Sequence, residues 1–368
     1  MPAERESEGQ PRLERETAPL RVLRFGRVSP LRSQTLWHAI AEGVSAGASP
    51  TLSFMRPDSP YVSVGYHHDL GHVDLEACAR AGVPVYRRMA GGGAVYLDDA
   101  QLFFQIAVPA SILPAVRSEA VARLLSPALP AFEAAGLPAR LDATGEIVVG
   151  DRKVCGHGAA QVGRAVVVVG NLIERFDHAA AAALLRAPGG EAAAEALQLM
   201  RRYVGPDPAS EVDAAAFETA AVRSYADALG REPVAGELSA LEQDALQRWD
   251  ETLESAEWRA GPAARALRAW QLKVRGGVFL VAAEDGGTRV RATVVDERLR
   301  AVCVEDPGLN DAAALASALS GHLLPELPSV LAGLGEPGRR LSAAFAAAST
   351  GELAAIAGRA TAAVREAS

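Results

Sequence analysis

Arg87-Arg88-Met89-Ala90-Gly91-Gly92-Gly93-Ala94-Val95-Tyr96 is the stretch on which the interpretation of this chain depends. It lies between two apolar runs, residues 83–86 and 102–108, that have the composition of β-strands. Glycine alone adopts positive φ without strain and lets another molecule approach the backbone closely. Glycine amides beside guanidinium groups suit an anionic ligand such as a phosphate or a carboxylate. The same pattern also fits a bulged turn with solvated arginines, so the stretch alone leaves both interpretations open.

The bulk composition restricts the class of protein. The chain has 368 residues, 49% hydrophobic and 22% charged, which predicts a globular protein of two domains. A formal net charge of -8 argues against a nucleic-acid-binding or membrane-surface role. No apolar run reaches the roughly 18 residues of a membrane-spanning helix, and residues 1–16 lack the apolar core of a signal peptide. Three widely spaced cysteines form neither a disulfide framework nor a zinc site, so we expect a cytoplasmic protein.

Lysine is almost absent from the chain. Of 37 basic residues only two, Lys153 and Lys273, are lysines. A lysine in such a chain can mark a position that needs a compact ammonium group, although chance retention explains Lys273 equally well. Lys153 follows a predicted hairpin turn at Gly150-Asp151 and precedes Gly156, so its side chain can point into a cleft. The alternative is an edge-strand lysine that prevents aggregation.

A histidine-rich segment follows the predicted strand at residues 61–65. His67, His68 and His72 lie close together in the sequence, with Asp69 and Asp74 nearby, which raises the question of a metal site. Adjacent histidines on a strand point to opposite faces, so they do not form a natural pair of ligands. We therefore favour a loop near the active site over a metal site.

The order of the predicted elements indicates an α/β (α+β) fold. Residues 1–19 are expected to be a disordered tail, and residues 20–257 a catalytic domain with a mixed β-sheet flanked by helices. The Ala-rich part of that domain, from residue 177, predicts covering helices without chemistry. Residues 258–340 predict a small α+β accessory domain, and residues 341–368 a C-terminal helix or tail.

Two stretches together resemble the lipoate–protein ligase A family, within the larger group that includes biotin ligases and octanoyltransferases. The first is Arg-Arg-x-x-Gly-Gly-Gly-Ala-Val-Tyr at residues 87–96, continued by Asp98, Gln101 and Leu102. The second is Gly-x-Arg-Lys-Val-x-Gly at residues 150–156, with a further match at residues 170–173. The resemblance covers roughly residues 20–335, and the order of the motifs makes it specific.

The resemblance implies a ligase that uses ATP and Mg²⁺ to convert lipoate or octanoate into an acyl-adenylate. The acyl group then passes to the ε-amine of a lysine on a lipoyl-domain acceptor protein. By the same resemblance Lys153 is the catalytic lysine, and Glu146 is a candidate metal or nucleotide contact. The implied substrate and adenylate contacts are Arg87, Arg88, Gly91, Gly92, Gly93, Ala94, Tyr96 and Gly156. We expect a monomer without nucleic-acid or membrane partners.

The chain departs from the family's pattern at several positions. Ala90 and Leu97 stand where Ser and His are usual, and Gly145-Glu146 replaces an Asn-Asp pair. Val169 and Asn171 replace a histidine and a threonine. These departures bear on adenylate contacts and metal binding, so the use of ATP needs a direct test.

Two other functions stay open at this point. Octanoyltransferases of this group use a cysteine thioester without ATP. Cys155 is a candidate nucleophile, because a thiol two residues from Lys153 can have a depressed pKa. Residues two apart on a strand share a face in any case, so this proximity alone does not establish the role. The cysteine of such transferases comes just before a late His-Gly pair, where this chain has Val167 and Val168. We therefore interpret Cys155 as a small residue at a position where the family usually has serine. A degenerate protein that binds an acyl group or a partner without catalysis is the third interpretation. The sequence does not identify the acceptor, nor does it decide between lipoate, octanoate and biotin.

Overall fold

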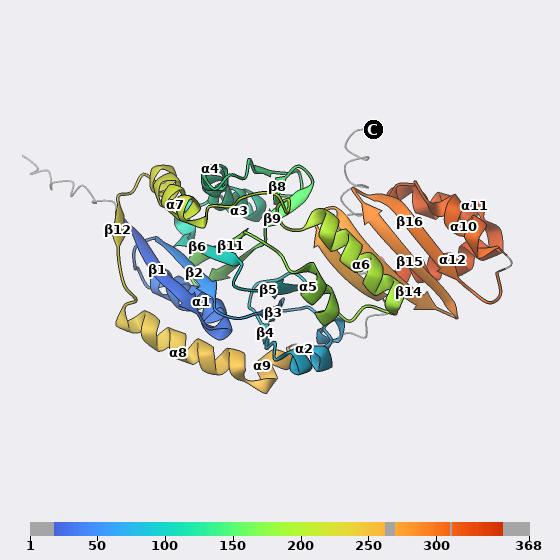
Figure 1. Ribbon diagram of the computed structural model, residues 1–368, viewed down its shortest axis with the longest axis horizontal. Coiled ribbons are helices and arrows are strands. Elements are labelled where there is room, and N and C mark those ends of the chain that lie inside the picture. Colours follow the sequence, from blue (N-terminus) through green and yellow to red (C-terminus); the bar gives the residue numbers. More distant parts are fainter. Residues whose placement is uncertain (1–17, 262–268, 310, 349–368) are drawn as a thin grey trace, which may run out of the picture.

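The computed structural model describes residues 18–261, 269–309 and 311–348 (Figure 1). The tail expected at residues 1–19 lies outside these residues except for its last two positions. The predicted α/β class is confirmed, because a large mixed sheet is flanked by helices and a second, smaller α+β unit follows it (Figure 1).

A six-stranded sheet in the order β10-β11-β6-β2-β1-β12 forms the centre of the catalytic part. It is mixed, because β2 runs parallel to β1 and antiparallel to β6. The strands are β1 (Leu20–Val28), β2 (Thr51–Pro57), β6 (Gln101–Pro109), β10 (His157–Val162), β11 (Ala165–Ile173) and β12 (Pro233–Ala235). Residues 233–235 lie inside the segment predicted to be helical, so that prediction is wrong for the edge strand β12.

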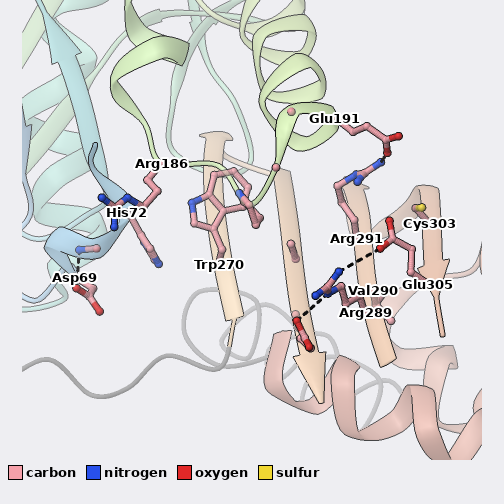
Figure 2. Close-up of a pocket in the computed structure, with 17 residues that line it drawn as sticks. Asp69, His72, Arg186, Glu191, Trp270, Arg289, Val290, Arg291, Cys303 and Glu305 are labelled. Atoms are coloured by element: carbon pink, nitrogen blue, oxygen red, sulfur yellow. Dashed lines mark hydrogen bonds and ion pairs between the residues drawn. The ribbon is translucent and has the colours of Figure 1, made fainter. Parts of the chain in front are cut away.

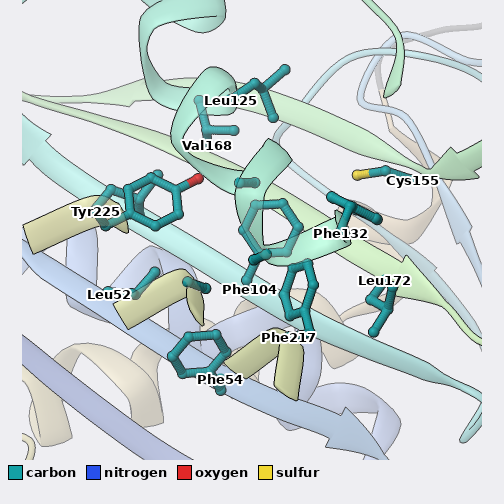
Figure 3. Packing of buried hydrophobic residues seen from close by; sticks show 14 of the residues in the cluster. Leu52, Phe54, Phe104, Leu125, Phe132, Cys155, Val168, Leu172, Phe217 and Tyr225 are labelled. Atoms are coloured by element: carbon teal, nitrogen blue, oxygen red, sulfur yellow. The ribbon is translucent and has the colours of Figure 1, made fainter. Parts of the chain in front are cut away.

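Helices cover both faces of this sheet, which explains why β6 and β11 are almost continuously apolar (Figure 1). One face packs against α1 (Pro30–Ser45) and α8 (Ala240–Glu254). The other face packs against α3 (Arg117–Leu125), α4 (Leu129–Ala134) and α7 (Ala214–Leu229). Under α4 and α7 the rings of Phe104, Phe132 and Phe217 pack with centroids between 5.0 and 6.3 Å apart (Figure 3). This aromatic core fixes the sheet from which the site is built.

Two three-stranded sheets carry the two sequence motifs. The glycine stretch joins β4 (Val85–Arg87) to β5 (Ala94–Leu97), which both pair with β3 (Tyr61–Val64). Lys153 lies on β9 (Arg152–Cys155), which pairs with β8 (Ile147–Val149), and β8 pairs with β7 (Arg140–Leu141). The helices around these sheets are α2 (Leu75–Ala81), α5 (His178–Leu184), α6 (Gly190–Tyr203) and α9 (Ala256–Ala260).

A β-bulge on β9 overturns the expectation that Lys153 and Cys155 share a face. Ile147 pairs with Cys155 and Val148 pairs with Lys153, so Val154 is one residue more than β8 can match. An extra residue in one strand resets the alternation of side chains. Lys153 therefore faces a cavity, whereas Val154 and Cys155 are both completely buried in the core.

The C-terminal unit is an antiparallel sheet with helices on one face. Its strands are β13 (Ala269–Arg275), β14 (Val278–Asp285), β15 (Thr288–Val295) and β16 (Arg298–Glu305). Its helices are α10 (Ala312–Leu319), α11 (Leu327–Gly333) and α12 (Gly335–Ala348), and they share one apolar cluster with the sheet. Helix α6 lies along this sheet as well and contributes to a second cluster with β13 and β14 (Figure 1). The C-terminal unit is thus packed directly against the part of the chain that carries Lys153.

Candidate functional site

The two sequence motifs line one cavity of about 300 Å³. Nine of the predicted site residues belong to its lining: Arg88, Gly91, Gly92, Gly93, Ala94, Tyr96, Glu146, Lys153 and Gly156. Four further positions that depart from the family's pattern, Ala90, Leu97, Val169 and Asn171, line it as well. Arg87 and Cys155 do not line this cavity.

The two arginines of the motif brace the backbone around the glycines. Arg87 is buried at 2% exposure and donates hydrogen bonds to five backbone carbonyls. Two of these carbonyls, of Arg259 and Ala260, belong to α9, and the Trp258 indole N–H donates back to the Arg87 carbonyl at 2.8 Å. Arg88 donates to the carbonyls of Ser63, Gly91 and Gly93 within the glycine stretch and its neighbour β3. The geometry therefore favours support of the loop by these arginines over the contact with an anionic ligand that the resemblance implies for them.

The glycines allow two segments of backbone to approach each other. Gly92 has φ of +95°, which is strained for other residues. A Cβ added to Gly65 would lie only 1.9 Å from the Gly92 carbonyl oxygen, so only glycine fits at that point. Backbone hydrogen bonds from Gly65 to Gly93 and from Tyr66 to Ala90 fix the loop in this position. The shape of this wall of the cavity is therefore set by the main chain.

A lysine and a glutamate form a half-buried ion pair in the cavity. Lys153 Nζ lies 3.1 Å from Glu146 Oε1, and the two side chains are only 19% and 6% exposed. Lys273 Nζ, from the C-terminal sheet, lies 3.9 Å from the same oxygen. Burial alone would raise the pKa of Glu146, but the two ammonium groups, together with hydrogen bonds from Lys153 and the Gly276 backbone, hold the pKa below its ordinary value. Glu146 is therefore ionised at neutral pH and pairs with both lysines of the chain.

A chain of amides supports the floor of the site. The Gly156 N–H donates to Asn171 Oδ1 at 2.6 Å, and Asn171 Nδ2 donates to Gln101 Oε1 at 2.7 Å. Gln101 Nε2 in turn donates to Asp98 at 3.3 Å. Asp98 and Gln101 belong to the first sequence motif. The hydrogen bonds of Asn171 were not predicted, because this asparagine replaces the residue that is usual in the family.

His157 also lines the cavity, although no motif in the sequence had selected it as a site residue. Burial, together with the nearby Lys153 ammonium group, lowers the pKa of His157 to about 4. The ring is therefore neutral at pH 7, and its buried Nδ1 accepts no hydrogen bond from the described residues.

One side of the cavity is apolar. Its lining includes residues of β11, α5, α6 and β13 and the segments that follow them, which pack in a single cluster: Ile173, Phe176, Ala181, Leu185, Met200, Val204, Leu272 and Val274. The Ala-rich helices, expected only to cover the sheet, therefore contribute to the site. A cavity with an apolar side and a cationic pair has the character of a pocket for an amphipathic anion.

Cys155 is part of the aromatic core. It is completely buried in the cluster that contains Phe132 and Leu172 (Figure 3). Burial raises the pKa of its thiol to about 12. The thiol is therefore protonated at neutral pH and has no access to the cavity, which argues against its candidacy as a nucleophile.

The histidine segment lies beside the glycine loop, as expected. A Cβ added to Gly93 would lie 3.9 Å from His68 Cε1, and His68 Nε2 lies 3.1 Å from His72 Nδ1. Across residues 18–261, 269–309 and 311–348 no three His, Cys, Asp or Glu side chains are placed to hold a metal ion. No helix in these same segments is long and apolar enough to cross a membrane.

A second cavity, of about 770 Å³, lies between the loops of the catalytic part and the C-terminal sheet (Figure 2). Its cations are mostly arginines with carboxylate partners. Arg289 is paired with Glu284 and Glu305, and Arg291 with Glu191 on α6 (Figure 2). None of the residues predicted from the two motifs lines this cavity, so the smaller one is the candidate site.

Known proteins share this sequence pattern and fold. A provisionally named lipoate-protein ligase A from Aeropyrum pernix is 31% identical over 139 residues, which is 38% of this chain and 51% of that relative. The chain therefore matches about half the length of this curated relative.

Two solved structures share the fold. A bipartite lipoate protein ligase from Thermoplasma acidophilum, described with its E2 lipoyl domain, has a TM-score of 0.61 at 20% identity, over 68% of this chain and 99% of that one. A lipoate-protein ligase A bound with ATP has a TM-score of 0.57 at 21% identity, over 66% and 99%. The family model "Lipoyl protein ligase A/B catalytic domain" matches residues 29–214, just over half of the 368 residues. The chain therefore belongs to the lipoyl protein ligase A/B catalytic domain family.

Proposed function

We propose that this protein is an ATP-dependent lipoate–protein ligase. It converts lipoate or octanoate into an acyl-adenylate and transfers the acyl group to a lysine of a lipoyl domain. The observation that carries the proposal is the meeting of Lys153, the glycine loop and an apolar wall in one cavity of about 300 Å³. The membership of the family and the likeness to an ATP-bound ligase support the same reaction.

Each part of the cavity has a task in this reaction. The apolar side binds the acyl chain, because burying its methylene groups is favourable. The carboxylate attacks the α-phosphorus of ATP and pyrophosphate leaves, a step that brings two negative groups together. The Lys153 ammonium group lowers this repulsion and then stabilises the oxygen charge that develops when the acceptor amine attacks the acyl carbon. AMP is the leaving group of the second step.

The described residues do not fit a magnesium ion at Glu146. Mg²⁺ binds oxygen ligands, and among the described residues that line the cavity only Glu146 has a carboxylate. Its Oε1 is engaged by Lys153, and a second ammonium group lies 3.9 Å away, which repels a dication. Glu146 is instead the counter-ion that keeps the Lys153 ammonium group in place.

The thioester route is less well supported. It needs a reactive thiolate that meets the acyl group, and Cys155 is buried in the apolar core with a pKa of about 12. A non-catalytic protein is also disfavoured, because a lysine held in a partly buried ion pair inside the cavity is costly without a use.

The test is intact-mass analysis of a lipoyl domain incubated with the protein. Parallel reactions contain lipoate with ATP, octanoate with ATP, and octanoyl-acyl-carrier protein without ATP. We expect a mass increase of one acyl group only in the reactions with ATP and free acid, and the larger yield identifies the preferred acid. An increase only from the carrier thioester would move the protein to the transferase class. No increase with several lipoyl domains would exclude the ligase activity proposed here.

A further inference from the structure

The two lysines of the chain come together in the structure. Lys153 and Lys273 are the only lysines among 37 basic residues, yet both side chains reach Oε1 of Glu146, at 3.1 and 3.9 Å. Both also line the same cavity. A composition that uses arginine almost everywhere else makes chance retention at two converging positions a weak explanation.

Lys273 is held in place by close packing of its strand. Leu272 and Val274, its neighbours on β13, line the cavity with it and pack in the apolar cluster of α6. Beyond them the Arg275 guanidinium stacks 5.1 Å from the ring of Tyr203. The turn that follows is pressed against the catalytic part, because a Cβ on Gly276 would lie 2.0 Å from Thr144 Oγ1. The C-terminal sheet thus places an ammonium group in the site of the other unit.

The charges of the lining favour an anion. Its charged residues are Arg88, Glu146, Lys153 and Lys273, three cations and one carboxylate. The Arg88 guanidinium is used by backbone carbonyls, which leaves two ammonium groups facing the carboxylate of Glu146. Lys273 Nζ lies 3.9 Å from Glu146 Oε1, close enough for attraction between the two charges and longer than a hydrogen bond.

We propose that Lys273 is a second substrate-binding residue, which binds the anionic group of the ligand together with Lys153. That group is the carboxylate of the free acid and then the acyl-phosphate group of the acyl-adenylate, each with one negative charge. Glu146 holds the two ammonium groups on one side of this anion. The inference rests on the proposed ligase function and adds to it a residue from the C-terminal unit.

The test measures binding, which does not depend on turnover. The probe is octanoyl-sulfamoyl-adenosine, in which an anionic acyl-sulfamate replaces the acyl-phosphate, and its Kd is measured by titration calorimetry. For Lys273→Gln we expect Kd to rise about 10- to 100-fold, because a charge-assisted hydrogen bond to the anion is lost. Lys273→Arg keeps the charge and is expected to recover most of the affinity. Arg289→Gln, on the same sheet but outside the cavity, is the matched control with unchanged Kd.

The outcomes separate the two proposals. A wild-type Kd for Lys273→Gln would overturn the role of Lys273 and leave the ligase function standing. Absence of binding by the wild-type protein would overturn both. A lower melting temperature of unliganded Lys273→Gln with an unchanged Kd would show that Lys273 is only a structural contact.

Discussion

The two cavities beside the C-terminal sheet differ in how their charges are arranged. In the larger one, of about 770 Å³, arginines pair with glutamates that are mostly exposed, such as Glu191 at 77% and Glu305 at 56%. In the smaller one, of about 300 Å³, two lysines share one carboxylate that is only 6% exposed. Arg291 joins the C-terminal sheet to Glu191 and Glu195 on α6, so its ion pairs connect the two units.

The difference teaches that size does not identify the site. Exposed ion pairs contribute little energy and leave no strong preference for a ligand, because solvent screens them. Buried charges such as Glu146, and buried polar atoms such as His157 Nδ1 that have no hydrogen-bond partner among the described residues, are costly to maintain and are found where a ligand compensates them. The comparison makes definite predictions, because substitutions in the two cavities should have very different effects on acyl transfer.

The largest effect is expected for Lys153→Ala. The variant removes the group that stabilises developing negative charge, and loss of one such donor lowers kcat by about 10²–10³-fold. The rate of lipoyl-domain modification, followed by intact mass, measures this. Near-normal turnover in a folded variant would show that Lys153 takes no part in the mechanism. The charges of the smaller cavity would then no longer identify it as the active site.

A smaller effect is expected for Gly65→Ala. The new Cβ would meet the Gly92 carbonyl at 1.9 Å, so the glycine loop must shift, and a displacement near 1 Å can cost about 10²-fold in rate. Gly71→Ala is the matched control at the larger cavity, where the new Cβ meets only the Asp69 side chain at 3.2 Å. We expect a loss of about 10- to 100-fold for Gly65→Ala and less than about threefold for Gly71→Ala. Equal rates for the two variants would show that the loop shape is not required.

Local sequence patterns were sufficient for part of this site. The motifs at residues 87–96 and 150–156 were assigned to one site from the sequence, and residues of both line one cavity, whereas anion binding by the glycine loop stays a prediction. These features depend on conformational freedom and charge at a few neighbouring positions, which the sequence states directly. The mixed sheet was also predictable, because runs such as residues 165–173 are too apolar for a strand with an exposed face.

Other features depend on contacts that no local pattern encodes. The bulge at Val154 arises from the pairing of β9 with β8. It resets the alternation of side chains along β9, so that Cys155 faces the core. Lys273 reaches Glu146 only because the C-terminal sheet packs against α6. Its rarity was a signal, but its partner could not be identified before the two units were seen together. The contribution of α5 and α6 to the apolar side of the cavity was missed for the same reason, because the sequence of an Ala-rich helix does not show which surface it packs against.

Cys155 and Cys303 should differ in their rates of alkylation, and substitution of Cys155 should leave acyl transfer nearly unchanged. Cys155 is completely buried with a pKa of about 12, whereas Cys303 lines the larger cavity and is partly exposed. Iodoacetamide should therefore label native Cys303 faster than native Cys155, as read by peptide mass spectrometry.

Cys155→Ser should keep acyl transfer within about threefold and lose about 1–3 kcal/mol of stability, because a hydroxyl replaces a buried thiol in an apolar cluster. Complete inactivation of a folded Cys155→Ser protein would restore the thioester route.

The smallest effect is expected for Arg291→Ala in the larger cavity. The substitution removes ion pairs to Glu191 at 2.8 Å and Glu195 at 3.1 Å, and these glutamates are 77% and 25% exposed. Solvent screens the pair with Glu191, and the pair with Glu195 is only partly exposed, so we expect about 1 kcal/mol of stability to be lost, seen as a small decrease in melting temperature. Acyl transfer should stay within about twofold of wild type, since Arg291 contacts no residue of the smaller cavity's ion pair. A loss of activity as large as that of Lys153→Ala, without a change in melting temperature, would mean that the larger cavity takes part in the reaction.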